Sequence, residues 1–423
     1  MVAMIAAVVA APSDVAESRL LRATRWALVA TAAGMPLYVV RWHYGPLPTT
    51  LLETLIVVTV ATYVVARWRD GWRRPLSTWF DIPIAALLVA GAISVIVAAD
   101  RRGALGLYRA YFVEPVAIFY VAIDLLRQGR TLAQTIAGFA AGSSVLALLN
   151  LRAFAQALLA NNIQVTGPPN AVYGDANYVA MFLEPAAAMA VGFLLFARGR
   201  WRWLGAVWLA ISALALMATL SKIALLAIVV LGAATIATQR RWRWPLVAAF
   251  FVAGIVVSQL PLVKERWSTA VYGLFLRLDI YASTAFTLRE HPIFGVGLGG
   301  FQVTYRTGSV QQYPHDVWLS FWVETGLLGL VAFGVIFFGL LWRGWKAWPT
   351  TAGMLRPALW GAMLGMVMWA VHGLFDTPYF KNDMSVEFWI IAGAAWCAIS
   401  SSRAGEAPAP SAARVERGLR PSG

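Results

Sequence analysis

Apolar runs long enough to cross a lipid bilayer recur along almost the whole chain. A membrane-spanning helix needs about 20 mostly apolar residues, because the hydrocarbon core is about 30 Å thick and each residue advances the helix by about 1.5 Å. Twelve runs come close to this length, and they predict a spanning helix at each of residues 24–41, 48–66, 80–99, 104–126, 132–153, 176–197, 203–220, 222–238, 244–260, 316–342, 356–375 and 384–402.

The same pattern divides the chain into five parts. Residues 1–23 form an N-terminal segment whose apolar start is too short to span a membrane, and residues 24–260 hold the first nine predicted spans. Residues 261–315 form a long loop, and residues 316–402 hold the last three spans. Residues 403–423 are rich in Pro, Ala and Gly, have little to bury, and are expected to be a disordered tail.

The loop 261–315 is much longer than a connection between two helices needs to be, and such loops are usually functional. Apolar residues recur at helical spacing over residues 262–276 and again over residues 277–290. This predicts amphipathic helices that form a cap on the membrane surface. Four glycines at positions 295, 297, 299 and 300 then predict a tight turn that closes the cap.

The composition agrees with a membrane protein. Of the 423 residues, 60% are hydrophobic and 13% are charged, whereas soluble domains are about 45–50% apolar and about 25% charged. This excludes a soluble enzyme and a disordered chain, and the single cysteine excludes an intrachain disulfide and a multi-cysteine metal site. The predicted fold is an all-α polytopic membrane bundle of about 12 transmembrane helices with an extracytoplasmic amphipathic helical cap.

The net charge of +14 is mainly a signal of membrane topology. Most Lys and Arg residues fall in alternate connections, such as 67–74, 198–202, 240–243 and 343–356, and cytoplasmic loops are the ones enriched in these residues. We therefore expect a multi-pass protein of the plasma (inner) membrane, with both termini cytoplasmic and the loop 261–315 outside. The bilayer is its expected partner, and nucleic acid is not needed to explain the charge.

The long outer loop is itself basic, which calls for a separate explanation. Cations there point to anion binding, because the planar arginine side chain offers several donors to phosphate oxygens. Two of them, Lys264 and Arg266, are expected to reach lipid headgroups instead. The basic residues of the loop are Lys264, Arg266, Arg277, Arg289 and Arg306.

Several short motifs occur in a fixed order. They are Thr219-Leu220-Ser221-Lys222 between two spans, Arg277, the stretch HPIFGVGLG at 291–299, His315-Asp316, the stretch ETGLLG at 324–329, and Asp376. In this combination the chain resembles the O-antigen ligase and polymerase superfamily, bacterial membrane glycosyltransferases that share the Wzy_C-type domain. Lys222 stands where the family has arginine, which keeps the charge but loses the two-pronged geometry. Asp316 stands where the family usually has asparagine.

The resemblance implies the transfer of a glycan from a polyprenyl (undecaprenyl) pyrophosphate carrier to an acceptor hydroxyl on the outer side of the membrane. It implies a helical fold related to the GT-C class of glycosyltransferases, without a metal or another cofactor. The expected partners are the lipid-linked glycan donor and a glycan, lipid or protein acceptor. A ligase, a polymerase and a protein O-oligosaccharyltransferase remain open.

The residues assigned to chemistry are those that can neutralise a leaving pyrophosphate or take a proton. His315 is the candidate general base, or an orienting group, for the acceptor hydroxyl, since histidine titrates near neutral pH. Basic side chains are the candidates for the pyrophosphate: Arg277, which is also placed in catalysis, Lys222, Arg289 and Arg109. Asp376, His372 and Asp316 are supporting candidates, and the first two are four residues apart on one helical face.

Simpler interpretations accompany these assignments. Arg109 and Glu114 are five residues apart and fit a structural ion pair, while His315 and Asp376 fit helix-end residues. For the whole chain, a 12-span transporter is the main alternative, because buried charges also mark transport paths. Transporters tend to have two related halves, and the loop 261–315 has no counterpart in the first half. A non-catalytic subunit of an envelope assembly complex is the third alternative.

Overall fold

The computed structural model describes residues 18–45, 47–71, 77–164, 167–239, 241–268, 270–304 and 310–404, and most of these are helical. The predicted N-terminal segment up to residue 17 and the tail from residue 405 lie outside the described residues. The elements in chain order are α2 (Arg19–Gly34), η1 (Met35–Val39), β1 (Arg41–Tyr44), β2 (Leu47–Thr50), α3 (Leu51–Asp70), α4 (Asp81–Val97), α5 (Arg101–Tyr108), the π-helical turn η2 (Arg109–Val113), α6 (Glu114–Leu125), α7 (Gly129–Leu159), α8 (Ala176–Phe196), α9 (Arg200–Ala218), α10 (Lys222–Thr238), α11 (Arg243–Gln259), α12 (Pro261–Ser268), α13 (Ala270–Glu290), β3 (Val303–Thr304), β4 (Val310–Gln311), α14 (Val317–Ala347), α15 (Leu355–Gly373) and α16 (Asn382–Ala404).

The all-helical prediction is confirmed, whereas the count of about twelve spans is not. Among the described residues, seven helices are long and apolar enough to cross a membrane, or eight if α11 and the α12–α13 segment form one span bent by 77°. The helices α4 and α10 are apolar but have 17 residues each. The helix α2 has only 16 residues and gives way to a 3-10 turn that carries Pro36.

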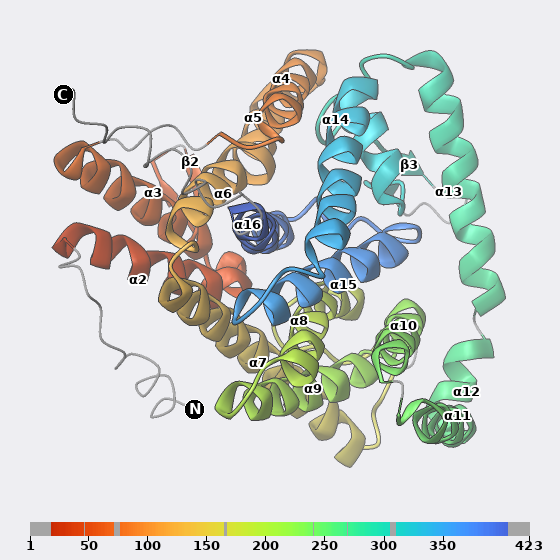
Figure 1. The fold of residues 1–423 in the computed structure, drawn as a ribbon. Helices are drawn as coiled ribbons and strands as arrows, with labels where there is room; N and C mark the ends of the chain where they lie inside the picture. Colours follow the sequence, from red (N-terminus) through yellow and green to blue (C-terminus); the bar gives the residue numbers. More distant parts are fainter. Residues whose placement is uncertain are drawn as a thin grey trace, which may run out of the picture.

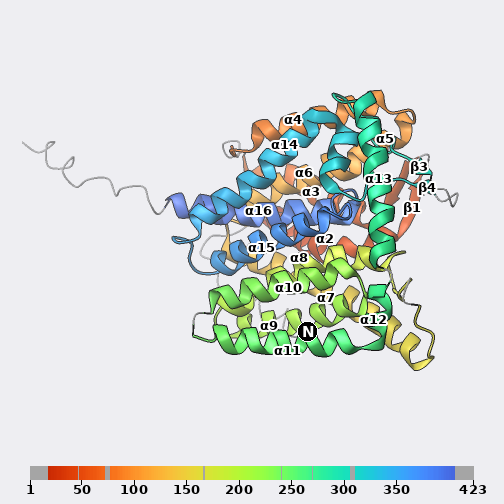
Figure 2. The same cartoon turned by 90° about the vertical axis from the view of Figure 1, so that its right-hand side faces the viewer.

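The main helices run side by side, and α13 lies across one end of them (Figures 1 and 2). Figure 2 shows the two antiparallel hairpins, β1–β2 and β3–β4, near the same end. We call this the α13 end of the bundle. The periodicity over residues 262–276 and 277–290 is present as α12 and α13, although α13 runs without interruption through the expected boundary at residue 277. That these helices form a cap on a membrane stays a prediction.

The centre of the bundle is built from α8, α15 and α16, and small residues bring the first two together. A Cβ atom added at Gly361 of α15 would lie 2.6 Å from the Cα atom of Met189 in α8. A Cβ atom at Gly192 of α8 would lie 2.4 Å from the backbone oxygen of Pro357. This close backbone approach is typical of helix pairs in membranes, and it fixes the helices from which the buried polar residues described below project.

The two glycine-containing motifs bind each other. The helix α14 is broken at Gly326, whose φ is 72° and ψ is −178°. The loop after α13 fills the break, because the Val296 N–H donates to the Val323 oxygen (2.7 Å) and the Leu327 N–H donates to the Ile293 oxygen (2.9 Å). The glycine-rich stretch is therefore more than the expected turn, since it replaces hydrogen bonds that α14 lacks at its break.

Replacing Gly326 by alanine is expected to destabilise the fold. Its backbone conformation is one that essentially only glycine adopts, at a cost of about 1–3 kcal/mol for other residues. A Cβ atom there would also lie 2.3 Å from the Ile293 oxygen. Thermal unfolding in detergent should show a lower melting temperature for Gly326→Ala than for Gly334→Ala, a change in the same helix with open space around the new Cβ. Equal melting temperatures would contradict this account of the break.

Candidate functional site

Two of the predicted phosphate-binding cations converge at the α13 end. Lys222 is the first residue of α10, and Arg277 lies in the first half of α13. Gly273 marks their meeting point, because a Cβ atom added to it would lie 3.7 Å from Arg277 Nη1 and 4.0 Å from Lys222 Nζ. The glycine leaves the space between the two cations open. Sequence positions 55 residues apart are thus brought together by the path of α13 across the bundle.

A third cation, Arg266 of α12, belongs to the same group. Its Nε–H donates to the backbone oxygen of Leu220, two residues before Lys222, at 3.0 Å. Burial lowers the pKa of Arg266; nearby Arg277 acts in the same direction, and Asp175 opposes both. From the sequence, Arg266 is expected to reach lipid headgroups. Residue spacing does not give the direction in which α12 leads into α13, so it could not predict this contact with the site. We call Lys222, Arg266 and Arg277 the basic cluster.

The predicted base, His315, lies beside the basic cluster in a hydrogen-bonded setting. Its Nδ1 is 3.3 Å from Asp376 Oδ1, and its Nε2 is 3.1 Å from the side-chain oxygen of Gln311. The backbone of His315 has a φ of 53°, which is uncommon for a residue other than glycine. Its side chain is 26% exposed, so a hydroxyl group of a substrate has a route to the ring.

The helix α13 holds both parts of this site in place. The Nε–H of Arg277 donates to the backbone oxygen of Phe375, the residue before Asp376, at 3.0 Å. One turn further along α13, the hydroxyl of Tyr281 is 2.7 Å from the Leu374 oxygen and 3.1 Å from the His315 oxygen. The same helix therefore supplies a cation and fixes the backbone on which the imidazole and its carboxylate partner sit.

Asp376 is held as a carboxylate. Burial on its own would raise its pKa, but the hydrogen bond and charge of His315, the charge of His372 and the Thr377 N–H lower the pKa to about 2. Such an ionised partner fixes the orientation of an imidazole and stabilises the imidazolium that forms when the ring takes a proton. His315 and Asp376 therefore have the geometry of a general base and its orienting acid.

The other two supporting candidates differ in their roles. Asp316 caps α14, with its Oδ1 accepting from the Leu319 N–H at 2.8 Å, and burial raises its pKa against those backbone hydrogen bonds. His372 is fully buried in α15 and pairs with Glu184 of α8 at 2.7 Å. The helix α15 ends at Gly373, so the predicted helical face shared by His372 and Asp376 is replaced by a turn in which the Asp376 N–H donates to the His372 oxygen (3.0 Å).

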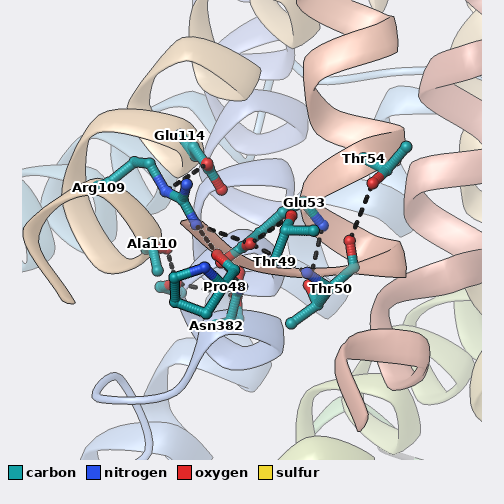
Figure 3. A network of polar contacts seen from close by, with 10 residues as sticks. Pro48, Thr49, Thr50, Glu53, Thr54, Arg109, Ala110, Glu114 and Asn382 are labelled. Carbon is teal, nitrogen blue, oxygen red and sulfur yellow. Dashed lines mark hydrogen bonds and ion pairs between the residues drawn. The ribbon is translucent and has the colours of Figure 1, made fainter. Parts of the chain in front are cut away.

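Arg109 lies in a separate polar network (Figure 3). Its side chain is 2.8 Å from Glu53 and 3.2 Å from Glu114, so the ion pair expected with Glu114 is present. Glu53 also accepts from the side chain of Asn382 and from the backbone of Thr50, where it completes the capping box of α3. Two acidic side chains already pair with this guanidinium, and the network joins α3, α6 and α16, an arrangement typical of a structural ion pair. Donor binding by Arg109 stays a prediction.

The structure does not bring Arg289 to the basic cluster. Arg289 is exposed and lies on α13, twelve residues after Arg277, which corresponds to about 18 Å along a helix. Arg306 lies outside the described residues. Arg277 and Arg289, both candidates for the pyrophosphate on sequence grounds, are therefore separated by the length of α13 between them.

Lys381 is a further cation near the site that sequence reasoning did not select. It precedes α16, and its Nζ lies 3.2 Å from the centre of the Tyr178 ring. Burial lowers the pKa of Lys381, while Asp383, Asp376 and Asp175 oppose this. The sequence indicates this position only by placing Lys381 in the last outer connection, between the predicted spans 356–375 and 384–402. The packing of α8, α15 and α16 then brings it close to the site.

Within the part of the chain that the structure describes, three or more His, Cys, Asp or Glu side chains nowhere form a group suited to holding a metal ion. The site instead combines a group of cations with an imidazole–carboxylate pair. Chemically, this arrangement suits binding of an oxyanion next to a group that takes up a proton.

Comparison with known proteins finds a match to one family model. A family model described as Wzy_C, O-antigen ligase, matches residues 206–334. The matched segment contains the basic cluster and His315, whereas Asp376 lies after it. No curated protein matches the chain. Residues 206–334 of this chain therefore match the Wzy_C, or O-antigen ligase, family model, which confirms the resemblance found in its sequence motifs.

Proposed function

We propose that this protein is a membrane glycosyltransferase that moves a glycan from a polyprenyl pyrophosphate carrier to an acceptor hydroxyl at the α13 end of the bundle. The observation that carries the proposal is the convergence of Lys222, Arg266 and Arg277 beside the His315–Asp376 pair. The three cations and His315 lie in the segment that matches the Wzy_C model. The basic cluster suits the pyrophosphate, and the imidazole suits the hydroxyl.

The proposed reaction is a displacement at the anomeric carbon of the donor sugar. The acceptor oxygen forms a bond to this carbon while the bond from the carbon to the pyrophosphate oxygen breaks, and the leaving pyrophosphate keeps the electron pair. Negative charge grows on that oxygen, so fixed cations stabilise the transition state more than the ground state. We assign this role to Arg277, with Lys222 and Arg266 holding the remaining phosphate oxygens.

His315 takes the proton of the acceptor hydroxyl in this proposal. Its Nδ1–H would point to Asp376, which leaves Nε2 as the basic nitrogen on the side of Gln311. Either end of an amide can face a ring nitrogen, so Gln311 can donate to Nε2 until an acceptor hydroxyl replaces it. Asp376 then stabilises the imidazolium, as a buried carboxylate does in other imidazole-dependent enzymes.

The distribution of charge supports an outward-facing α13 end. Arg343 lies over the ring of Trp79 at 3.9 Å, and Arg356 lies over Trp348 at 4.7 Å. Arg343 and Trp348 lie at the C-terminal end of α14, the far end from its start beside His315. Basic and tryptophan residues together are typical of the cytoplasmic membrane interface. We propose that both chain termini and this far end are cytoplasmic, in the plasma (inner) membrane.

The direct test is transfer in vitro by the purified protein in EDTA. A pooled extract of polyprenyl-pyrophosphate glycans serves as donor, and lipid A core, free glycan and protein are offered as separate acceptors. We expect donor consumption in EDTA, with the acceptor that is extended separating a ligase from a polymerase or a protein O-oligosaccharyltransferase. No consumption under conditions in which an established O-antigen ligase works would overturn the proposal in favour of transport or assembly.

A further inference from the structure

A second imidazole–carboxylate pair lies directly behind Asp376, inside the bundle. Nδ1 of His372 in α15 is 2.7 Å from Oε1 of Glu184 in α8, and the two side chains are 0% and 1% exposed. Among the described residues, His372 Nε2 and Glu184 Oε2 have no hydrogen-bond partner. Such a pair is costly to bury, because each charged group gives up its hydration, so a purely structural role is a weak explanation for it.

The position of this pair connects it to the proposed catalytic pair. The backbone N–H of Asp376 donates to the backbone oxygen of His372 at 3.0 Å. The side-chain Oδ1 of Asp376 accepts a hydrogen bond from Nδ1 of His315. The charges of both His315 and His372 act on the Asp376 carboxylate. Asp376 therefore lies between two imidazoles, one facing the site and one facing the bundle interior.

We propose that Glu184 is a positioning residue for the reaction: its hydrogen bond to His372 fixes that buried residue, whose backbone oxygen accepts from the Asp376 N–H, and so keeps the Asp376 carboxylate directed at His315. This inference rests on the proposed function, because it assigns His315 as the base. The order of groups is Glu184, His372, Asp376 and His315, alternating carboxylate and imidazole from the interior outward.

The neighbouring charges allow the sign of the effect to be worked out. His372 faces Glu184, Asp376 and Arg277, while Glu184 also faces Glu387 of α16. Asp376 faces His315, His372, Lys381, Tyr178 and Tyr281, and its carboxylate also interacts directly with that of Glu184. Without the Glu184 carboxylate, a proton on His372 loses its hydrogen-bonded partner, so we expect one positive charge that acts on the Asp376 carboxylate to be lost. A proton on the Asp376–His315 pair is then opposed by one positive charge fewer, so the expected change for the pair is towards higher pH.

The test follows the reaction of His315 with diethyl pyrocarbonate, which at a histidine modifies the neutral imidazole and not the imidazolium. Rates at each histidine are measured by peptide mass spectrometry over a range of pH in the full-length protein. His43 and His291 are exposed and serve as internal references. The matched control is Glu387→Gln, since Glu387 is equally buried on a helix next to α15 but forms no hydrogen bond with a histidine among the described residues.

For Glu184→Gln we expect the His315 modification curve to move to higher pH by about half a unit or more, with the reference histidines unchanged. The acidic limb of the kcat/KM profile should move in the same direction. Glu387→Gln should leave both curves in place. An unchanged His315 curve in a folded Glu184→Gln protein, or an equal shift in Glu387→Gln, would overturn the inference.

A second variant keeps the test decisive if Glu184→Gln does not fold. His372→Gln removes the buried cation while the carboxylate stays, and it should move the His315 curve in the same direction. An unchanged curve there would overturn the inference as well. Because modification needs no donor, a wild-type protein without transferase activity would contradict the proposed function and still leave this measurement of the His315 environment.

Discussion

Replacing His315 by alanine is expected to lower donor turnover by about 10²- to 10⁴-fold, the usual contribution of a general base. The ring is held by the Asp376 carboxylate on one nitrogen, and on the other it contacts Gln311, which an acceptor hydroxyl would replace. The measurement is the initial rate of lipid-linked glycan consumption at saturating donor. Thermal unfolding of the same preparation establishes that the variant is folded.

His291→Ala is the comparison for this prediction. His291 is exposed, lies at the end of α13 and has no part in the proposed proton transfer. We expect its turnover to stay close to the wild-type value. A folded His315→Ala protein with a turnover similar to that of His291→Ala would show that the base lies elsewhere.

Arg277→Ala is expected to produce the second large loss, about 10²- to 10³-fold in turnover, the usual effect of removing one charged donor from a developing oxyanion. Its Nε–H also binds the Phe375 oxygen, so the change loosens the backbone before Asp376. Arg277→Lys keeps the charge but not the fork of donors, and we expect it to recover only part of the rate. The measurement is kcat and KM for the lipid-linked donor.

Arg289→Ala tests whether position on α13 decides the effect. Both arginines are sequence-based candidates for binding the donor pyrophosphate, whereas the structure places Arg289 about 18 Å along the helix from Arg277. We expect a much smaller loss for Arg289→Ala. Equal losses in the two variants would mean that the donor contacts α13 along its whole length, which contradicts a pyrophosphate site confined to the basic cluster.

The positions of the helices could be predicted well from the sequence, because apolar runs and polar breaks are properties of single segments. A helix is present at every predicted run, from α2 to α16. The number of spans could not be predicted in the same way. Turns such as the one at Pro36 shorten some runs, so that α2, with 16 residues, falls below the length required to cross a bilayer.

From the sequence, only those site residues that belong to the ordered motifs could be predicted. Lys222, Arg277, His315 and Asp376 are brought to one end of the bundle. Arg266, Lys381 and Glu184 acquire their positions through the crossing of α13 and the packing of α8 against α15, which no local pattern encodes. The glycine motifs illustrate the same limit, since the partner of the loop after α13 is a break in α14.

The central claim is that the basic cluster binds the donor and that His315 acts in the chemical step. The most direct test measures donor affinity and donor turnover separately in His315→Ala and Arg277→Ala. We predict that His315→Ala binds the lipid-linked donor with wild-type affinity but does not transfer its glycan, and that Arg277→Ala binds the donor about 10-fold more weakly or worse. Wild-type donor affinity in Arg277→Ala, or wild-type turnover in His315→Ala, would contradict the claim.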